Sequence, residues 1–149
     1  MKDLRELIKR FDHVGIAVKD VDEALKTYRD ILGSKLLVYK KIGTSQDYTF
    51  TQVSLGSQTI EMIEPIFGKE SFLTRFLRER GEGLHHLTFQ VYDIKETIKF
   101  LKSKAIRIVD EFIEIDPLWQ TAFISPRSSN GVLIQLYETV KGSEYDHSS

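Results

Sequence analysis

The sequence predicts an α+β fold in which two tandem βαβββ modules form one curved mixed sheet with a concave active-site cleft. Two observations support this prediction. The chain repeats itself, because residues 12–18 match residues 85–91 at an offset of 73 and residues 60–64 match residues 134–138 at an offset of 74. In each copy, a short β-branched and aromatic run precedes an apolar pattern of helical period and then further short apolar runs.

The composition favours a single globular domain over residues 1–149. Hydrophobic residues make up 41% and charged residues 29%, which excludes wholesale disorder. Lys and Arg total 21 against 22 Asp and Glu, so no positive excess exists to attract nucleic acid. Cysteine is absent, which excludes disulfide scaffolds, cysteine nucleophiles and thiolate metal sites. The first ten residues lack the apolar core of a signal peptide and no stretch reaches 18 apolar residues, so we expect a cytoplasmic protein without membrane contact.

The first module is expected over residues 11–66. Its opening strand, 12–18, ends before Asp20, a helix N-cap candidate with Glu23 three residues later in a capping-box-like arrangement. The helix has an apolar stripe at spacing i, i+3, i+4, i+7, formed by Val21, Ala24, Leu25 and Tyr28. It ends at Gly33. The three following strands are predicted at 35–41, 48–55 and 58–65, the last two joined by a hairpin at 56–57.

The second module is expected over residues 84–139 and repeats this order. Asp93 and Glu96 mark its helix start. The stripe of that helix is formed by Ile94, Thr97, Ile98 and Leu101. Strands follow at 107–115, 119–125 and 132–138. A linker at 68–83 holds one more helix, which ends at Gly81, and the polar tail at 141–149 is expected to be flexible.

Polar residues occupy equivalent strand positions in the two modules. Because side chains alternate along a strand, His86 shares a face with Thr88 and Gln90, while His85 points the other way. His13 holds the matching position in the first module. Glu61 and Gln135 likewise hold matching positions in the last strand of each module.

If the modules pack about a pseudo-twofold axis, His13, Glu61, His86 and Gln135 converge in the cleft. Two imidazoles, one carboxylate and one amide oxygen suit a divalent ion such as Zn, Co, Ni, Mn or Fe. Each residue also has a structural interpretation, because strand histidines are usually structural, Glu61 could face solvent, and Gln135 could simply be hydrogen-bonded. His85 is expected to be structural and His147 to lie in the tail. A cluster of basic residues is expected either to be a solvated helix face or to meet an anionic substrate group: Arg75, Arg78 and Arg80.

Over about residues 11–139 the chain resembles the vicinal oxygen chelate (glyoxalase/bleomycin resistance/dioxygenase) superfamily, and its closest local match is to methylmalonyl-CoA epimerases. The resemblance is carried by four stretches in the family order: 11–18, 55–65, 76–87 and 125–134. It implies a metal held by His13, Glu61, His86 and Gln135. It also implies an isomerase or lyase that acts on a small thioester through an enolate-type intermediate, with Glu61 as displaceable ligand and base.

The chain departs from the family pattern at two places. Family enzymes normally carry glutamate where Gln135 stands, and Glu138 lies on the opposite strand face. A glutamate-containing stretch before the third strand corresponds here to residues 45–48, which contain none.

Several alternatives remain open within the fold. One is a lyase of the lactoylglutathione lyase (glyoxalase I) type, and another is a paralogue without catalysis. A third is a resistance-type or other binding protein whose cleft would be lined by aromatic side chains: Tyr48, Phe50, Phe89, Trp119 and Phe123. A homodimer is expected by analogy, with Phe72 and Phe76 offering apolar surface.

Overall fold

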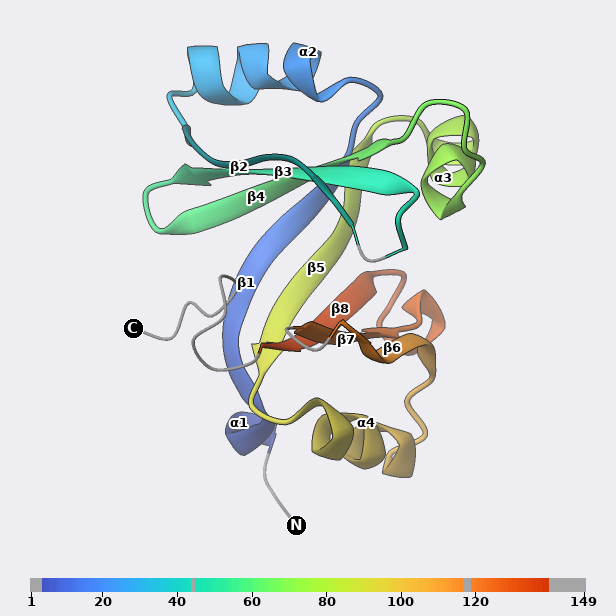
Figure 1. Ribbon diagram of the computed structural model, residues 1–149. Helices are drawn as coiled ribbons and strands as arrows, with labels where there is room; N and C mark the ends of the chain where they lie inside the picture. Colours follow the sequence, from blue (N-terminus) through green and yellow to red (C-terminus); the bar gives the residue numbers. More distant parts are fainter. Residues whose placement is uncertain (1–3, 44, 117–118, 140–149) are drawn as a thin grey trace. The chain divides into compact units, whose positions relative to one another are not determined.

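A computed structural model describes residues 4–43, 45–116 and 119–139 (Figure 1). The strands form a mixed eight-stranded sheet in the order β2-β3-β4-β1-β5-β8-β7-β6, as the predicted fold class requires. The chain divides into two compact units, one formed by residues 13–85 and the other by the residues on either side of that stretch. No helix in the described part of the chain is long and apolar enough to cross a membrane.

The unit of residues 13–85 holds the predicted first module except for its first two residues, together with the linker helix. Its elements in chain order are the end of β1 (Ile8–Ala17), α2 (Val21–Leu25), the π-helical segment η1 (Lys26–Ile31), β2 (Lys35–Ile42), β3 (Tyr48–Leu55), β4 (Gln58–Pro65) and α3 (Phe72–Arg80). β1 pairs with β4 in parallel, and β2, β3 and β4 pair antiparallel. The beginning of β5 (Gly83–Val91) closes this unit.

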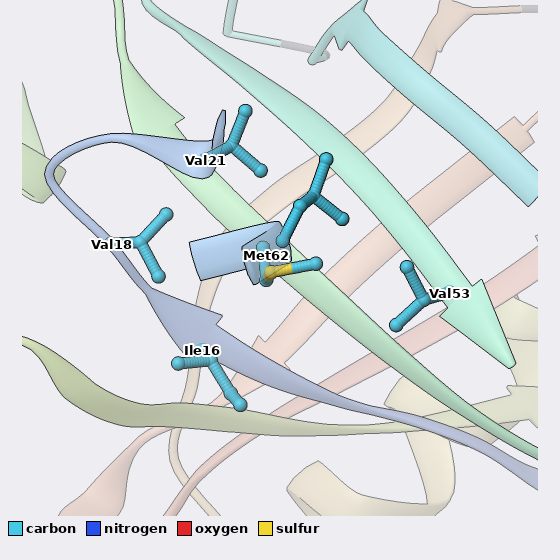
Figure 2. Packing of buried hydrophobic residues seen from close by; sticks show 6 residues of the cluster. Ile16, Val18, Val21, Val53 and Met62 are labelled. Atoms are coloured by element: carbon cyan, nitrogen blue, oxygen red, sulfur yellow. The ribbon is translucent and has the colours of Figure 1, made fainter. Parts of the chain in front are cut away.

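The core of this unit lies between α2 and one face of its strands. Figure 2 shows Ile16, Val18, Val21, Val53 and Met62 packed together. In β1 the core residues are even-numbered, because alternate side chains point to opposite faces. The odd-numbered residues of β1, His13 among them, therefore lie on the face that α2 does not cover.

The second unit repeats the arrangement. Its further elements are α1 (Leu4–Leu7), α4 (Ile94–Ser103), β6 (Ile108–Asp116), β7 (Trp119–Ile124), the 3₁₀ turn η2 (Pro126–Ser128) and β8 (Leu133–Thr139). β5 pairs with β8 in parallel, and β6, β7 and β8 pair antiparallel. Buried Val91, Ile94, Ile98 and Leu136 form part of the core between α4 and the strands. The face that carries His86 is again the one away from the helix.

The start of β1 belongs to this second unit through three contacts. The Tyr92 N–H donates to the Leu7 carbonyl over 3.0 Å, and the Tyr137 hydroxyl donates to Asp12 Oδ1 over 2.7 Å. The Phe11 ring also lies edge-on to Phe89, with centroids 5.5 Å apart. β1 therefore begins at Ile8, earlier than the predicted residue 12, because the alternation of charged and apolar residues at its start gave no clear strand signal.

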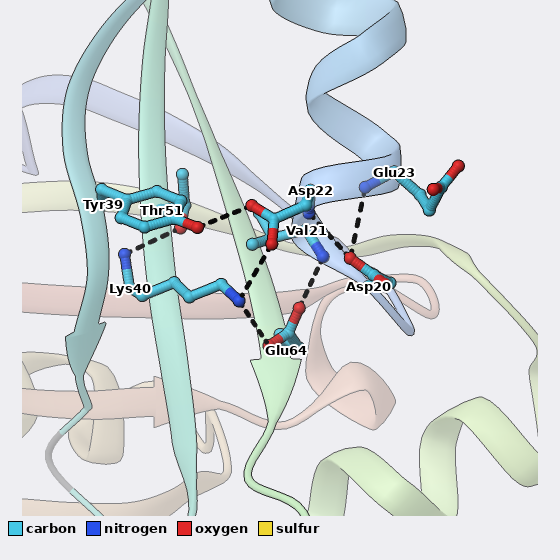
Figure 3. Close-up of polar contacts among 8 residues, drawn as sticks. All are labelled: Asp20, Val21, Asp22, Glu23, Tyr39, Lys40, Thr51 and Glu64. Atoms are coloured by element: carbon cyan, nitrogen blue, oxygen red, sulfur yellow. Dashed lines mark hydrogen bonds and ion pairs between the residues drawn. The ribbon is translucent and has the colours of Figure 1, made fainter.

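Each module helix is held at its first turn in the same two ways. Asp20 Oδ1 accepts hydrogen bonds from the N–H groups of Asp22 and Glu23, at 2.9 and 3.2 Å, which confirms it as the N-cap (Figure 3). Glu64, on β4, accepts a hydrogen bond from the Val21 N–H over 2.5 Å. Glu64 therefore ties the last strand of the module to the start of its helix.

The second module has the same pair of contacts. Asp93 accepts from the Glu96 N–H at 3.0 Å, and Glu138 on β8 accepts from the Ile94 N–H at 3.3 Å. Glu138 therefore faces the helix, as strand parity predicts, and cannot replace Gln135 on the opposite face. The predicted tail at 141–149, including His147, and the side chain of Trp119 lie outside what the structure describes.

Candidate metal and acid–base site

His13 and Glu61 come together within the unit of residues 13–85. The register of β1 and β4 sets His13 opposite Thr59 and Gly15 opposite Glu61, so the two functional side chains share a face and lie diagonally across adjacent strands. His13 Nε2 lies 3.4 Å from Glu61 Oε2. Both residues are buried, with 2% and 5% of their surfaces exposed. An imidazole and a carboxylate thus meet in a place largely closed to water.

Gln52 orients the Glu61 carboxylate. Its Nε2 donates to Glu61 Oε2 over 2.8 Å. This hydrogen bond has the length of a well-formed N–H···O contact and holds the carboxyl group in one orientation.

Gln52 was missed in the sequence analysis, although a signal for it exists. A two-residue turn at 56–57 sets Leu55 opposite Gln58, and the same register then sets Gln52 opposite Glu61. Extending the register of this hairpin along both strands therefore identifies Gln52 from the sequence.

The second unit places His86 and Gln135 in the same relation. The register of β5 and β8 sets His86 opposite Leu133 and Thr88 opposite Gln135, which repeats the diagonal of His13 and Glu61. His86 is 7% exposed and Gln135 is 5% exposed. Each unit therefore supplies one buried imidazole and one oxygen donor on the strand face away from its helix.

Gln135 is held by two buried threonines, which the sequence analysis did not identify as its partners. Thr88 Oγ1 donates to Gln135 Oε1 over 2.9 Å, and Gln135 Nε2 donates to Thr121 Oγ1 over 3.2 Å. Thr88 and Thr121 are both fully buried. The register of β7 and β8 could not be extended from a short turn here, because the connection between them contains η2 and several further residues.

His85 has the structural environment that was expected of it. Its ring lies 4.7 Å from the Phe76 ring and 5.7 Å from the Phe72 ring, both on α3. Burial lowers the pKa of His85 to about 4, with Arg80 lowering it further and Glu61 opposing the shift. His85 is therefore neutral at pH 7.

Two of the basic residues of α3, Arg78 and Arg80, have partners close to them in the sequence. Arg78 pairs with Glu70 at 2.8 Å on the surface, and the Arg80 guanidinium lies 5.6 Å from the centre of the Phe76 ring. Both contacts fit the solvated-face interpretation better than a substrate anchor.

The aromatic residues considered as cleft lining divide between the two strand faces. Tyr48 and Phe50 share the face of Glu61, and Phe123, opposite Gln135, shares the face of that residue. Phe89 packs instead against the core beneath α4, so its placement in a cleft was wrong. Strand parity indicates this from the sequence, because Phe89 is an odd number of residues from His86.

The donor atoms that each unit supplies are of kinds that bind divalent cations. Neutral imidazole nitrogen, carboxylate oxygen and amide oxygen are all ligands of first-row divalent metals, and the burial of each one limits competition from water. The same carboxylate can accept a proton from a bound substrate. Metal binding and proton transfer would both use side chains on the strand face that points away from the helix of each unit.

Comparisons with known proteins show which family the chain resembles. A family model described as "Glyoxalase/Bleomycin resistance protein/Dioxygenase superfamily" matches residues 12–123. An uncharacterized protein, YqjC of Bacillus subtilis, is 33% identical over 93% of this chain and 98% of its own length. The mitochondrial methylmalonyl-CoA epimerase of Mus musculus is 32% identical over 85% of this chain and 71% of its own. The crystal structure of methylmalonyl-CoA epimerase from Mycobacterium tuberculosis superimposes with a TM-score of 0.80 at 31% identity, covering 94% of this chain and 93% of that one.

Proposed function

The chain belongs to the glyoxalase/bleomycin resistance protein/dioxygenase superfamily, and from that premise we propose that it is a metal-dependent isomerase acting on a small acyl thioester. The reaction would be epimerisation at the carbon next to the thioester carbonyl, as the names of the methylmalonyl-CoA epimerases among its relatives suggest. The observation that carries the proposal is the buried contact between His13 and Glu61, because it brings an imidazole, which can bind a metal, beside a carboxylate, which can accept a proton.

The proposed ligands are His13, Glu61, His86 and Gln135, around Zn, Co, Ni, Mn or Fe. Two observations support this set. Each unit presents one imidazole and one oxygen donor at repeat-equivalent positions. All four residues are at least nine-tenths buried. When bound, a divalent ion stabilises the negative charge that develops on the substrate oxygen as the α-proton leaves.

Glu61 is proposed as the base. Its carboxylate is the acidic side chain among these four, and Gln135 as a neutral amide cannot take up a proton in this role. Gln52 donates to Glu61 Oε2 over 2.8 Å and so fixes the orientation of the carboxylate that would accept the substrate proton. Gln52 is thus proposed as a positioning residue for proton transfer.

The metal proposal is tested by counting bound ions. We expect wild-type protein to bind one Co²⁺ or Mn²⁺ per chain in calorimetric titration after chelator treatment. His13→Ala and His86→Ala, one from each unit, should each remove that single site. His85→Ala is the matched control, because the adjacent histidine faces α3, and it should retain the site. Wild-type protein that binds no divalent ion would overturn the proposal.

The reaction proposal is tested by proton exchange. Methylmalonyl-CoA incubated with metal-loaded enzyme in D₂O should lose its α-proton signal in the NMR spectrum. Glu61→Gln should slow this exchange at least a hundredfold, since general-base catalysis contributes about 10²–10⁴. Turnover of a glutathione hemithioacetal without α-proton exchange in the thioester would instead establish the lyase alternative.

A further inference from the structure

Gln135 belongs to a chain of hydrogen bonds with a definite direction. The Thr121 hydroxyl donates its single proton to the Leu136 carbonyl over 2.9 Å. Toward Gln135, therefore, the Thr121 oxygen can only accept, and it accepts from Nε2. At the other end, the Thr88 hydroxyl donates to Gln135 Oε1.

These bonds determine which end of the amide faces which strand. The nitrogen of Gln135 is turned toward β7, which carries Thr121, and the oxygen is turned toward β5, which carries Thr88. His86 lies on β5 two residues before Thr88 and on the same face. The amide oxygen, which still has a second lone pair, therefore faces the strand of the histidine.

We infer that Thr88 and Thr121 are positioning residues that make Gln135 present its oxygen, and not its nitrogen, to a cation held by His86. This inference rests on the proposed function, because it concerns one of the proposed ligands. An amide can act as a metal ligand only through oxygen, so the orientation decides whether Gln135 contributes. If the amide were turned over, its NH₂ group would face the cation and repel it.

The same network distinguishes an amide from a carboxylate. An ionised glutamate at position 135 would bring an oxygen without a proton against Thr121, while the Thr121 proton is donated to Leu136. Either that bond to the Leu136 carbonyl breaks, or two oxygens meet without a proton between them. The two threonines therefore fit the residue that distinguishes this chain from the glutamate of the family pattern.

The experiment measures Co²⁺ affinity by calorimetry on folded full-length protein. Thr121→Val removes the acceptor for Nε2 while it keeps the β-branched shape, and we expect a three- to tenfold loss of affinity. Thr121→Ser keeps the hydroxyl and should stay within twofold of wild type. Thr88→Val, with Thr88→Ser as its control, tests the oxygen end and carries the experiment if Thr121→Val does not fold, as judged by circular dichroism.

A second background separates positioning from general damage. Gln135→Leu should weaken Co²⁺ binding by itself, and adding Thr121→Val to it should cause no further loss beyond twofold, because the group to be positioned is gone. An equal loss in both backgrounds overturns the inference, as does unchanged affinity in both valine variants. Those results leave the proposed function standing. If wild-type protein binds no divalent ion, both this inference and the proposed function are overturned.

Discussion

At the scale of single residues, two adjacent histidines have opposite environments. His85 packs against the rings of Phe72 and Phe76 on α3, whereas His86 lies on the other face of β5 beside Thr88. The alternation of a strand is sufficient to separate a structural imidazole from a candidate ligand.

His85 makes the fold sensitive to acid. In the unfolded chain histidine titrates near its ordinary pKa of 6.5, but burial lowers the pKa of His85 to about 4 in the folded protein. Between these values the unfolded state binds more protons, so stability falls as the pH falls. We expect His85 to account for roughly 2 kcal/mol of lost unfolding free energy between pH 7 and pH 4.5. Urea unfolding with chelator present should show a shallower pH dependence for His85→Phe, and parallel curves would contradict the assignment.

Gln135→Glu should have opposite effects in the absence and presence of metal. Without metal, one buried acceptor near Thr121 loses its donor, and we expect a loss of about 1–2 kcal/mol in unfolding free energy. With Co²⁺ present the new carboxylate adds charge to the ligand set, so the stabilisation by metal should exceed that of wild type. Thermal unfolding with and without Co²⁺ measures both. A variant more stable than wild type without metal would show that the threonine network does not prefer an amide.

At the scale of elements, the carboxylates that link strand to helix are the feature shared by the two modules. Glu64 also lies 3.8 Å from Lys40, whose ammonium group lies 3.3 Å from Asp22 at the start of α2 (Figure 3). Tyr39 donates to the same Asp22 over 2.6 Å and, with Lys40, lowers the pKa of that carboxyl. Edge strand β2 is thereby joined to α2 as well as to β3.

The hydrogen bond between Glu138 on β8 and the Ile94 N–H allows a test of how much a strand-to-helix contact stabilises the fold. Burial raises the pKa of Glu138, so the folded protein takes up this proton more readily than the unfolded chain, and stability falls as the pH rises through the range just above the ordinary value. Glu138→Gln retains an acceptor for the Ile94 N–H and should gain stability relative to wild type between pH 4.5 and pH 7. Glu138→Leu should be about 1 kcal/mol less stable than Glu138→Gln, because it leaves the helix start without this acceptor. Urea unfolding at pH 4.5 and pH 7 measures these differences. If the unfolding free energy of Glu138→Gln changes with pH in the same way as that of wild type, the prediction is contradicted.

At the scale of the whole molecule, the ion proposed above should raise the unfolding free energy of the protein. A ligand that binds only the folded state at a hundred times its Kd adds about 2.7 kcal/mol to the unfolding free energy. We expect this gain with Co²⁺ for wild type and its loss in both His13→Ala and His86→Ala, measured by urea unfolding. If one alanine variant keeps the full gain, the unit that carries that histidine does not contribute to the site.

The repeat explains how much could be predicted from the sequence. Its offset located His13, Glu61, His86 and Gln135 at equivalent strand positions, and the apolar stripes of the helices indicated which strand face is covered. Hydrogen bonds between side chains on neighbouring strands are harder to predict from the sequence, because they depend on the register of the two strands. Gln52 could be found through the two-residue turn at 56–57, but the partnership of Thr121 with Gln135 depends on a longer connection that has no such rule. The π-helical turn of η1 likewise had no sequence signal.

The contacts of Glu64 and Glu138 have a consequence for how such a protein can change over evolution. Each half holds its own helix with a side chain from its own final strand, and it does so on the face opposite the candidate site residues. After a duplication, mutations on the strand face away from the helix can accumulate in one copy without breaking the hydrogen bond that holds the helix of that copy. Glu61 and Gln135 differ at matching positions of that face, whereas the two halves hold their helices by the same kind of contact.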